Sequence, residues 1–533
     1  MFICRFHYYF QFPQPLVFIG LSPKFPTFYF KTLSAVVVVG LQMETSAEKP
    51  EMLSPPPPAA TRLLEICRVT PSPPPSAQYT LPLTFFDTLW LKFPPVERIF
   101  FYKLSATSSS SPPPEFHAAV VPRLKRSLSL ALSRFLPLAG TLTWPADTDI
   151  PFVLHTPGDG VSLAVAESTS SDGGDFDLLS GDGPRDAALS RAYLPKLAVS
   201  GSNAAVLALQ VTLFPSKGFC VGAACHHAVM DGKSSAMFLK AWAHISMCDD
   251  GDGTLTEELT PFLDRTVVKD PDGIALEDVK TWMDICGAED DTRSLEFMPE
   301  TVLNVTKSNK VRATFKLSRQ DIQNLKQSTM RQLESNKDTC LEIKPNNLST
   351  FVITYAYTLV CMAKAKGLED DKKAFFGFTA DCRFRLEPPL PSNYFGNCVF
   401  GFAADIAIGD LVHEAGIASA AHKLVEVIRE IDKGVPKDAK GRLGRMFRML
   451  ATSLEGGLIG VGVAGSTRLG VYGVDFGYGR PEKVEITSID RTLGMSMAES
   501  GDGSGGVEVG VAMETQEMAG FTSAFIDGLN KVA

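Results

Sequence analysis

The stretch Cys225-His226-His227-Ala228-Val229-Met230-Asp231-Gly232 connects a β-rich segment to a helix-forming segment. Before it, residues 205–214 and 218–225 are apolar runs separated by a proline-containing turn, which predicts two neighbouring strands. After it, residues 234–244 have the periodicity of a helix. The sequence therefore places two histidines at the end of a strand and an aspartate in the turn that leads into a helix.

His227 is the candidate for chemistry in this turn. A histidine at a strand end can titrate near neutral pH and reach a substrate in a cleft, which suits a general base. A bare H-x-x-x-D spacing is more often a satisfied polar turn, so the motif alone does not establish an active site. The segment lacks the histidine pair of a zinc protease and has no third ligand nearby, so no metal site is predicted.

Helix and strand patterns alternate along the remaining chain without regular βα repetition. Helical spacing of apolar residues predicts helices at residues 123–135 and 349–365, and a further helix near the C-terminus that carries Met518, Phe521, Phe525 and Leu529 on one face. Such a mixture favours an α+β fold, with helices layered on large sheets.

The composition excludes several classes of protein. The 533 residues carry 51 basic and 60 acidic side chains, a net charge of −9, which disfavours a nucleic-acid-binding protein. No uninterrupted run of about 20 apolar residues predicts a membrane span. The ten cysteines are scattered and include no C-x-x-C pair, so neither a disulfide scaffold nor a structural zinc site is expected. We therefore expect a reduced, cytoplasmic protein with no membrane or nucleic-acid partner.

Residues 1–42 differ in composition from the rest of the chain. They include eleven aromatic residues and four prolines but no acidic residue. The prolines interrupt any signal-peptide core, and the apolar run at 33–41 is too short to span a bilayer. A hydrophilic segment begins at Met43. We expect Met43 to be the native initiator and residues 1–42 to be a non-native leader, with a genuine targeting segment as the alternative.

Three glycine-rich segments resemble nucleotide-binding signatures. Residues 460–465 match G-x-G-x-x-G, but the segment before them is predicted to be helical and the segment after them extended, whereas a dinucleotide site needs a strand and then a helix. Residues 501–506 match the same pattern inside an acidic turn that would repel a pyrophosphate. Residues 232–234 end like a P-loop, but His227 occupies the position of its first glycine. No permanently bound nucleotide cofactor is predicted.

A second segment, residues 471–481 (VYGVDFGYGRP), places three glycines around Asp475. By itself it is a turn-dense loop with close backbone packing. Together with His227 and Asp231 upstream, it resembles the two hallmark motifs, HxxxD and DFGWG, of the plant BAHD acyl-CoA-dependent acyltransferases. In this sequence a tyrosine replaces the usual tryptophan, and the structural residues of the motif are Phe476, Gly477, Tyr478 and Gly479.

Two further segments extend the resemblance to nearly everything after Met43. Residues 83–102 (LTFFDTLWLKFPPVERIFFY) and 393–398 (NYFGNC) are similar to the branch that acylates the sugars of anthocyanin, flavonoid and other phenolic glucosides. Malonyl-CoA is the commonest donor in that branch. The resemblance thus implies a malonyltransferase-like, acyl-CoA-dependent O-acyltransferase, with acyl-CoA as co-substrate and a phenolic glycoside as acceptor.

The resemblance also implies an architecture. It implies two chloramphenicol-acetyltransferase-like α+β domains with a channel between them. Residues 43–254 would form the first domain with HxxxD, and residues 277–533 the second with the DFGYG segment. A crossover loop at 255–276 would join them, and the segment around 475–506 would pack with the first domain.

The family resemblance assigns roles to the motif residues. His227 would take the proton of the sugar hydroxyl as its oxygen attacks the thioester carbon, and would then reprotonate the CoA thiolate. Asp231 invites a triad interpretation, but the family favours an ion pair with an arginine, here Arg383 or Arg385. Asp475 is expected to pack its loop in preference to accepting a second proton.

An acidic protein must provide local donors for an anionic co-substrate. The CoA phosphates are expected at the N-terminus of the 349–365 helix, near Ser349 and Thr350. The malonyl carboxylate requires a basic group, for which Arg468 and Lys233 are the candidates. Neither a metal nor a permanent cofactor is expected, and the protein is expected to act as a monomer.

Two alternatives stay open. The first keeps the family but uses a hydroxycinnamoyl-CoA donor, or an alcohol or amine acceptor. The second is a catalytically silent binding protein on the same fold, against which the intact His227 and Asp231 argue.

Overall fold

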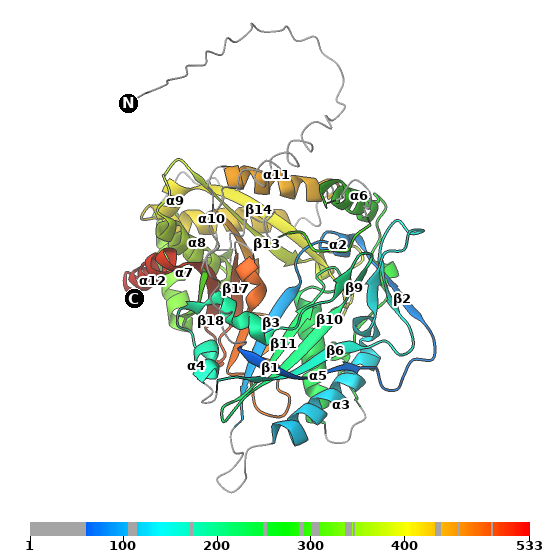
Figure 1. Ribbon diagram of the computed structural model, residues 1–533. Coiled ribbons are helices and arrows are strands. Elements are labelled where there is room, and N and C mark those ends of the chain that lie inside the picture. Colours follow the sequence, from blue (N-terminus) through cyan, green and yellow to red (C-terminus); the bar gives the residue numbers. More distant parts are fainter. Residues whose placement is uncertain are drawn as a thin grey trace, which may run out of the picture. The chain divides into compact units, whose positions relative to one another are not determined.

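The strand pair before the histidine turn lies inside a six-stranded sheet. In the computed structural model these two strands are antiparallel neighbours (Figure 1). The structure describes residues 60–532 apart from 105–114, 171–173, 249–252, 287–292, 300–309, 336–343, 345–346, 432–438, 456–458 and 492–493. The expected leader at 1–42 lies outside the described residues. The sheet has the strand order β1 (Thr61–Val69), β6 (Val161–Ser168), β10 (Leu207–Phe214), β11 (Gly218–Cys225), β3 (Val96–Lys103) and β16 (Lys483–Ile486).

A seven-stranded sheet forms the framework of the C-terminal half. Its order is β14 (Val399–Ala407), β13 (Lys373–Asp381), β15 (Ile459–Ala464), β17 (Gly494–Glu499), β18 (Val507–Glu514), β12 (Lys310–Leu317) and β7 (Arg185–Asp186). A smaller five-stranded sheet has the order β2 (Tyr79–Pro82), β5 (Phe152–His155), β4 (Thr141–Thr143), β9 (Asn203–Ala205) and β8 (Val199–Ser200).

The two large sheets exchange strands. β16 comes from the C-terminal part of the chain but pairs antiparallel with β3, and β7 comes from the N-terminal part but pairs antiparallel with β12. The exchanged strands are also joined to each other, because Arg185 on β7 forms a buried ion pair with Glu485 on β16. Arg312 on β12 approaches the same Glu485 carboxylate at 3.6 Å and Asp490 at 2.8 Å. A buried charge network thus lies where the two halves cross.

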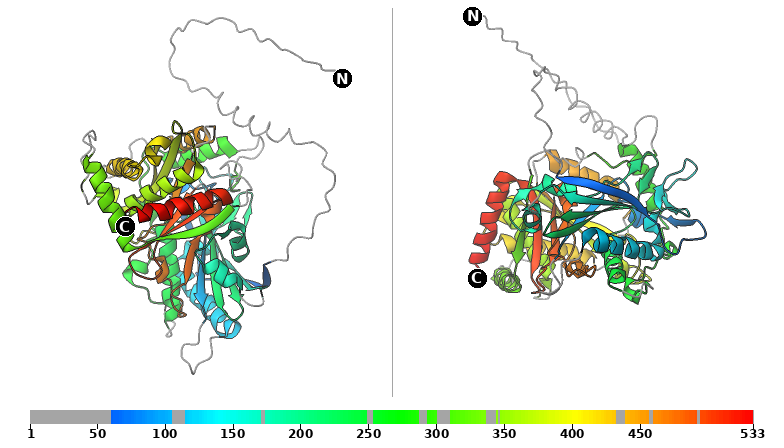
Figure 2. Two further views of the ribbon diagram at one scale, coloured as in Figure 1. Left: turned by 90° about the vertical axis from the view of Figure 1, so that its left-hand side faces the viewer. Right: turned by 60° about the horizontal axis from the view of Figure 1, so that its bottom comes forward.

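Helices cover the sheets. α3 (Val121–Arg134) and α5 (Gly232–Met247) pack on the six-stranded sheet, where the Trp242 indole donates to the Leu124 carbonyl at 3.2 Å. Helices α8 (Thr350–Lys366) and α12 (Thr515–Asn530) pack on the seven-stranded sheet, and Figure 2 shows α12 in red. The other described α-helices are α2 (Phe85–Thr88), α4 (Gly174–Ser180), α6 (Ile274–Cys286), α7 (Arg319–Ser335), α9 (Ile408–Val412), α10 (Gly416–Ile431) and α11 (Arg442–Glu455).

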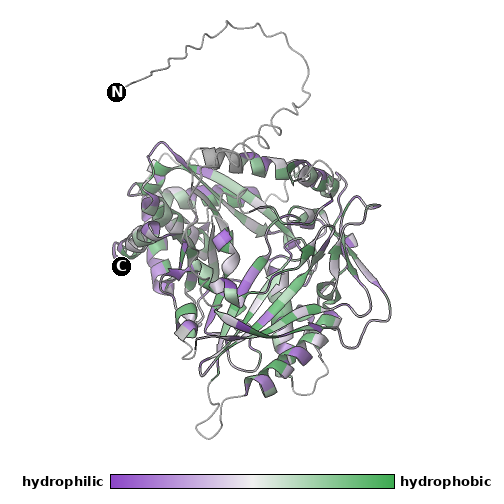
Figure 3. Cartoon of the chain, in the orientation of Figure 1, coloured by the Kyte–Doolittle hydropathy of each residue, from purple (hydrophilic) through white to green (hydrophobic). Residues whose placement is uncertain are grey.

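The observed elements confirm the predicted α+β class. The predicted helices at 123–135, 234–244 and 349–365 correspond to α3, α5 and α8, with ends that differ by at most three residues. The strands are largely apolar (Figure 3) because most of them are covered by helices or loops. Within the described residues, no helix is long and apolar enough to cross a membrane.

Candidate active site

The histidine turn is fixed at both ends by the backbone. β11 ends at Cys225, and α5 begins at Gly232 with Asp231 as its N-cap, whose Oδ1 accepts from the Ser234 N–H at 2.9 Å. This is a favourable helix start because the carboxylate satisfies an N–H that has no partner within the helix. His226 is fully buried, and its Nδ1 accepts from the Ala228 N–H at 3.2 Å. His226 therefore shapes the turn, and His227 is the partly exposed histidine of the pair.

The imidazole of His227 lies face to face with an indole. Its ring centroid is 4.0 Å from that of Trp90, and the two planes are inclined by 5°. Nδ1 is enclosed and has no hydrogen-bond partner in the described part of the chain, which leaves Nε2 as the nitrogen open to a substrate. Burial lowers the pKa of His227 to about 4, against smaller opposing effects of its own backbone and of Asp231. At neutral pH the ring is thus neutral, the state that a general base requires.

Asp231 points away from His227 into an ion pair. Its Oδ2 lies 2.9 Å from Nη1 of Arg383 and accepts from the Cys398 N–H at 3.1 Å. Burial raises the pKa of Asp231 and is the largest single effect, but the Arg383 charge and the hydrogen bonds from Arg383, Ser234 and Cys398 together outweigh it and hold that pKa below its usual value. Arg383 is fully buried and also donates from Nη2 to the carbonyl of Gly396 at 2.9 Å. The pair ties the histidine turn to the NYFGNC segment.

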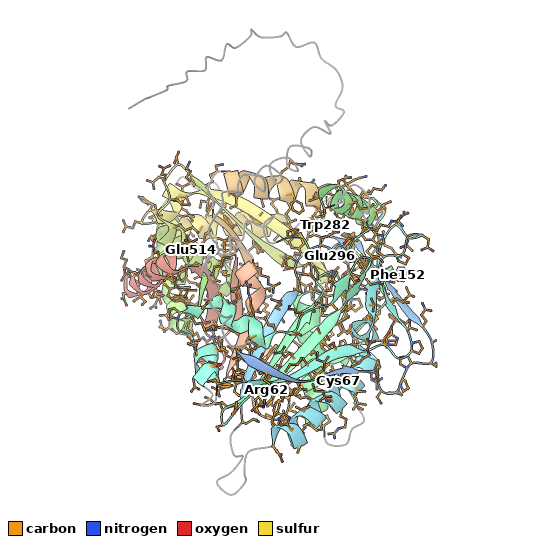
Figure 4. The ribbon with its side chains drawn as sticks, viewed as in Figure 1. Arg62, Cys67, Phe152, Trp282, Glu296 and Glu514 are labelled. Atoms are coloured by element: carbon orange, nitrogen blue, oxygen red, sulfur yellow. The ribbon has the colours of Figure 1, made fainter. Side chains whose placement is uncertain are left out.

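The LTFFDTLW and NYFGNC segments meet at the backbone of the histidine turn. The side-chain amide of Asn397 donates to the His227 carbonyl at 2.8 Å and to Asp87 Oδ1 at 2.9 Å. Arg265 lies 3.3 Å from Asp87 Oδ2, and it donates to the Val229 carbonyl at 3.3 Å. Trp282 of α6, labelled in Figure 4, donates to a backbone carbonyl of the same LTFFDTLW segment at 3.0 Å. Residues from both halves of the chain thus hold the backbone of the base.

The DFGYG segment lies at the other end of α5. The Ser246 hydroxyl donates to the Phe476 carbonyl at 2.9 Å, and Ser246 is fourteen residues, or about 20 Å, along the helix from Gly232. Oδ1 of Asp475 accepts three backbone N–H groups, those of Gly477, Tyr478 and Gly479, at 2.8, 3.1 and 3.0 Å. Asp475 thus organises its own loop and lies away from the His227 ring.

The tyrosine that stands in place of the family tryptophan is half-buried. The ring of Tyr478 packs edge-on against Phe219 with centroids 5.6 Å apart, and the Arg123 guanidinium lies 5.8 Å from its centroid. Phe476 is fully buried against Trp242, with centroids 4.6 Å apart. The motif therefore anchors the loop before β16 on α3, α5 and β11.

The residues proposed to bind the co-substrate are spread over several places. Ser349 caps α8, where its Oγ accepts from the Val352 N–H at 3.2 Å, and Thr350 is the first residue of that helix. Lys233 lies 3.4 Å from Asp381. Arg385 donates to the Asp381 carbonyl at 2.7 Å, and it is Arg383, not Arg385, that pairs with Asp231. Arg468 is exposed, in the loop after β15. The structure brings Lys233 and Arg383 close to the histidine turn through Asp381, and places Ser349 on another helix.

Four contributions to the site come from residues to which the sequence patterns assigned no role. These are Trp90 against the imidazole, Asn397 at the His227 carbonyl, and the buried Asp87 and Arg265 that hold the turn. For Asp87 the sequence signal was a charged residue inside the otherwise apolar LTFFDTLW segment.

Comparison with known proteins identifies the family of the chain. The Transferase family model matches residues 63–527. The malonyl-CoA:anthocyanidin 5-O-glucoside-6''-O-malonyltransferase of Arabidopsis thaliana is 40% identical over 474 residues, covering 88% of this chain and 99% of that protein. The agmatine coumaroyltransferase of the same plant is 36% identical, covering 87% and 98%. The crystal structure of vinorine synthase superposes with a TM-score of 0.58 at 20% identity, covering 86% and 96%.

The family match and the identity to the relatives define the chain as an acyltransferase. The chain belongs to the BAHD acyltransferase family. It is an acyl-CoA-dependent O-acyltransferase of that family.

Proposed function

We propose that the protein transfers a malonyl group from malonyl-CoA to a sugar hydroxyl of a phenolic glucoside, of the anthocyanin, flavonoid or related type. The observation that carries the proposal is the imidazole of His227, stacked on Trp90 with Nδ1 enclosed and Nε2 open, in a turn whose backbone is held by contacts from three segments. The 40% identity to a malonyltransferase over nearly its whole length supports the choice of donor and acceptor.

The mechanism follows from the two ring nitrogens and the neutral state. Nε2 of His227 accepts the proton of the sugar hydroxyl while its oxygen attacks the thioester carbon, which forms a tetrahedral oxyanion. Collapse of this intermediate breaks the carbon–sulfur bond, and the imidazolium returns the proton to the CoA thiolate. Trp90 keeps the ring in place and its π face favours the transient imidazolium. Asp231 and Arg383 hold the loop, and Asp475 holds the DFGYG turn.

The test is a coupled assay on the purified full chain. Malonyl-CoA with a phenolic glucoside should release CoA thiol and give a product heavier by one malonyl group, and His227→Ala should abolish both signals. His413→Ala, at an exposed histidine, is the matched control and should keep full activity. Equal thiol release by the wild type and His227→Ala would refute the mechanism.

A second candidate function uses a hydroxycinnamoyl donor or an amine acceptor. The 36% identity to an agmatine coumaroyltransferase favours it. Coumaroyl-CoA and agmatine in the same assay distinguish the two, because the reaction with the higher kcat/KM identifies the donor and acceptor.

The proposal also covers the domain boundaries, the cellular location and the oligomeric state. We assign residues 43–254 and 277–533 to two domains joined by 255–276, with residues 475–506 packing partly on the first domain, which the pairing of β16 with β3 supports. We place the protein in the cytoplasm as a monomer. The eight cysteines among the described residues are free thiols, which suits a reducing compartment.

A further inference from the structure

An arginine close to the histidine turn is buried without a carboxylate partner. Arg98 lies on β3, and its side chain shares a face with Phe100 and Tyr102, which pack in the core beneath α3 and α5. Only 3% of Arg98 is exposed. Burial of a guanidinium costs free energy unless an anion compensates its charge.

The surroundings of Arg98 compensate its charge only in part. Its Nη1 lies 3.5 Å from the Ser235 hydroxyl, and its Nε has no hydrogen-bond partner in the described chain. Asp231 pairs with Arg383, and Glu499 accepts from the Tyr472 N–H at 3.0 Å, so in the described chain neither forms an ion pair with Arg98. Burial lowers the pKa of Arg98, and the negative charges of Asp231 and Glu499 offset only part of that effect. Arg98 therefore has no direct ion-pair partner among the described residues.

The guanidinium is directed at the start of α5. Its Nη2 lies 3.5 Å from the position that a Cβ would take at Gly232, the first residue of the helix, and Leu469 Cδ1 lies 3.4 Å from the same position. The first N–H groups of a helix carry a partial positive charge and favour an anion, and at α5 the Ser234 N–H is already bound by Asp231. The Arg98 charge makes a minor contribution to the lowered pKa of His227. A buried donor and a helix N-terminus thus converge beside the base.

We propose that Arg98, together with the N-terminus of α5, binds the free carboxylate of a dicarboxylic acyl group, and so selects malonyl-CoA over neutral acyl donors. This inference rests on the proposed function. A malonyl carboxylate supplies the direct ion-pair partner that the described residues do not provide, whereas an acetyl or coumaroyl group leaves Arg98 without one. Neither Lys233, which pairs with Asp381, nor the exposed Arg468 is needed for this contact.

The test compares two donors on the full chain. Arg98→Gln should lower kcat/KM for malonyl-CoA by about 10- to 100-fold, the value of a hydrogen bond to a charged group, and should leave kcat/KM for acetyl-CoA unchanged or higher. Arg98→Lys should fall between the wild type and Arg98→Gln, because it keeps the charge but loses the planar donor pair. Arg331→Gln, at an exposed arginine on α7, is the matched control and should not change the ratio of the two donors.

A substrate-side measurement removes the dependence on variants. The wild type should bind malonyl-CoA at least about 10-fold more tightly than the analogue in which a primary amide replaces the carboxylate. An unchanged donor ratio in Arg98→Gln, or equal binding of the acid and the amide, would overturn the inference while the transferase proposal stands. Failure of the wild type to use malonyl-CoA at all would overturn both.

Discussion

Replacing Asp231 by asparagine separates a structural role of this residue from a triad role. Asparagine is as good an N-cap as aspartate, so the bond from the Ser234 N–H to Oδ1 is kept. The change removes the charge that faces Arg383 and turns an amide N–H₂ toward the Cys398 N–H, which donates to Oδ2 in the native protein. The perturbation is therefore confined to the ion pair and one hydrogen bond.

The expected cost follows from the burial of both partners. Breaking a buried ion pair by removing one partner costs about 3–5 kcal/mol. Arg383 keeps a second carboxylate, because Asp381 Oδ1 also lies 2.9 Å from its Nη1, but the Asp381 side chain is 37% exposed and compensates less. We therefore expect a loss near the lower limit, about 3 kcal/mol, from the free energy of unfolding. Asp231→Ala should lose about 1 kcal/mol more because it also removes the cap.

Urea unfolding and kcat together decide between the two roles. Under the structural role, Asp231→Asn lowers the urea midpoint and the activity together, and Arg383→Met in the same chain recovers part of the stability because no unpaired buried charge is left. An unchanged midpoint with a large loss of kcat would refute this reasoning and restore the triad interpretation.

Three further predictions follow from other contacts. Because burial lowers the pKa of His227 to about 4, kcat/KM should be lost only as the pH falls toward 4, where the ring becomes protonated; an acid limb near pH 6.5 in the pH–rate profile would contradict this. Trp90→Ala should reduce kcat by roughly 5-fold, since an aromatic pair contributes about 1 kcal/mol, while Trp90→Phe should keep most of the activity; equal kcat for both would exclude stacking as the cause. Glu485→Gln should lower the free energy of unfolding, measured in urea, by about 3–5 kcal/mol because it removes a carboxylate partner from buried Arg185 and Arg312. The control Glu482→Gln, at an exposed position, should change that free energy by under about 0.5 kcal/mol.

The local structure around the histidine turn could be predicted because it depends on neighbouring residues. Apolar runs on both sides of a short turn gave β10 and β11, and helical spacing gave α3, α5 and α8 close to their observed ends. Asp231 in the turn before a helix is a recognisable N-cap, which is why its position was clear although its partner was ambiguous between two arginines.

The strand exchange and the surroundings of the site depend on tertiary contacts that leave no local pattern in the sequence. β16 has only four residues, which alternate charged and apolar; this is the pattern of a strand, but it is too short to predict one by itself, and nothing in it indicates pairing with a distant sheet. Arg98 lies within an apolar run, and only the fold shows that its neighbours are already paired. The helix cap at Ser349 was visible in the sequence, but the distance between this helix end and the histidine turn was not.

The reciprocal exchange of β7 and β16 limits how far the two large sheets can move apart. A hinge motion between them would have to break the pairing of β16 with β3 or of β7 with β12, and it would separate Arg185 from Glu485. Breaking a buried ion pair costs about 3–5 kcal/mol, whereas side-chain and loop movements that leave the exchange intact are far less costly. The two sheets therefore behave as one mechanical unit.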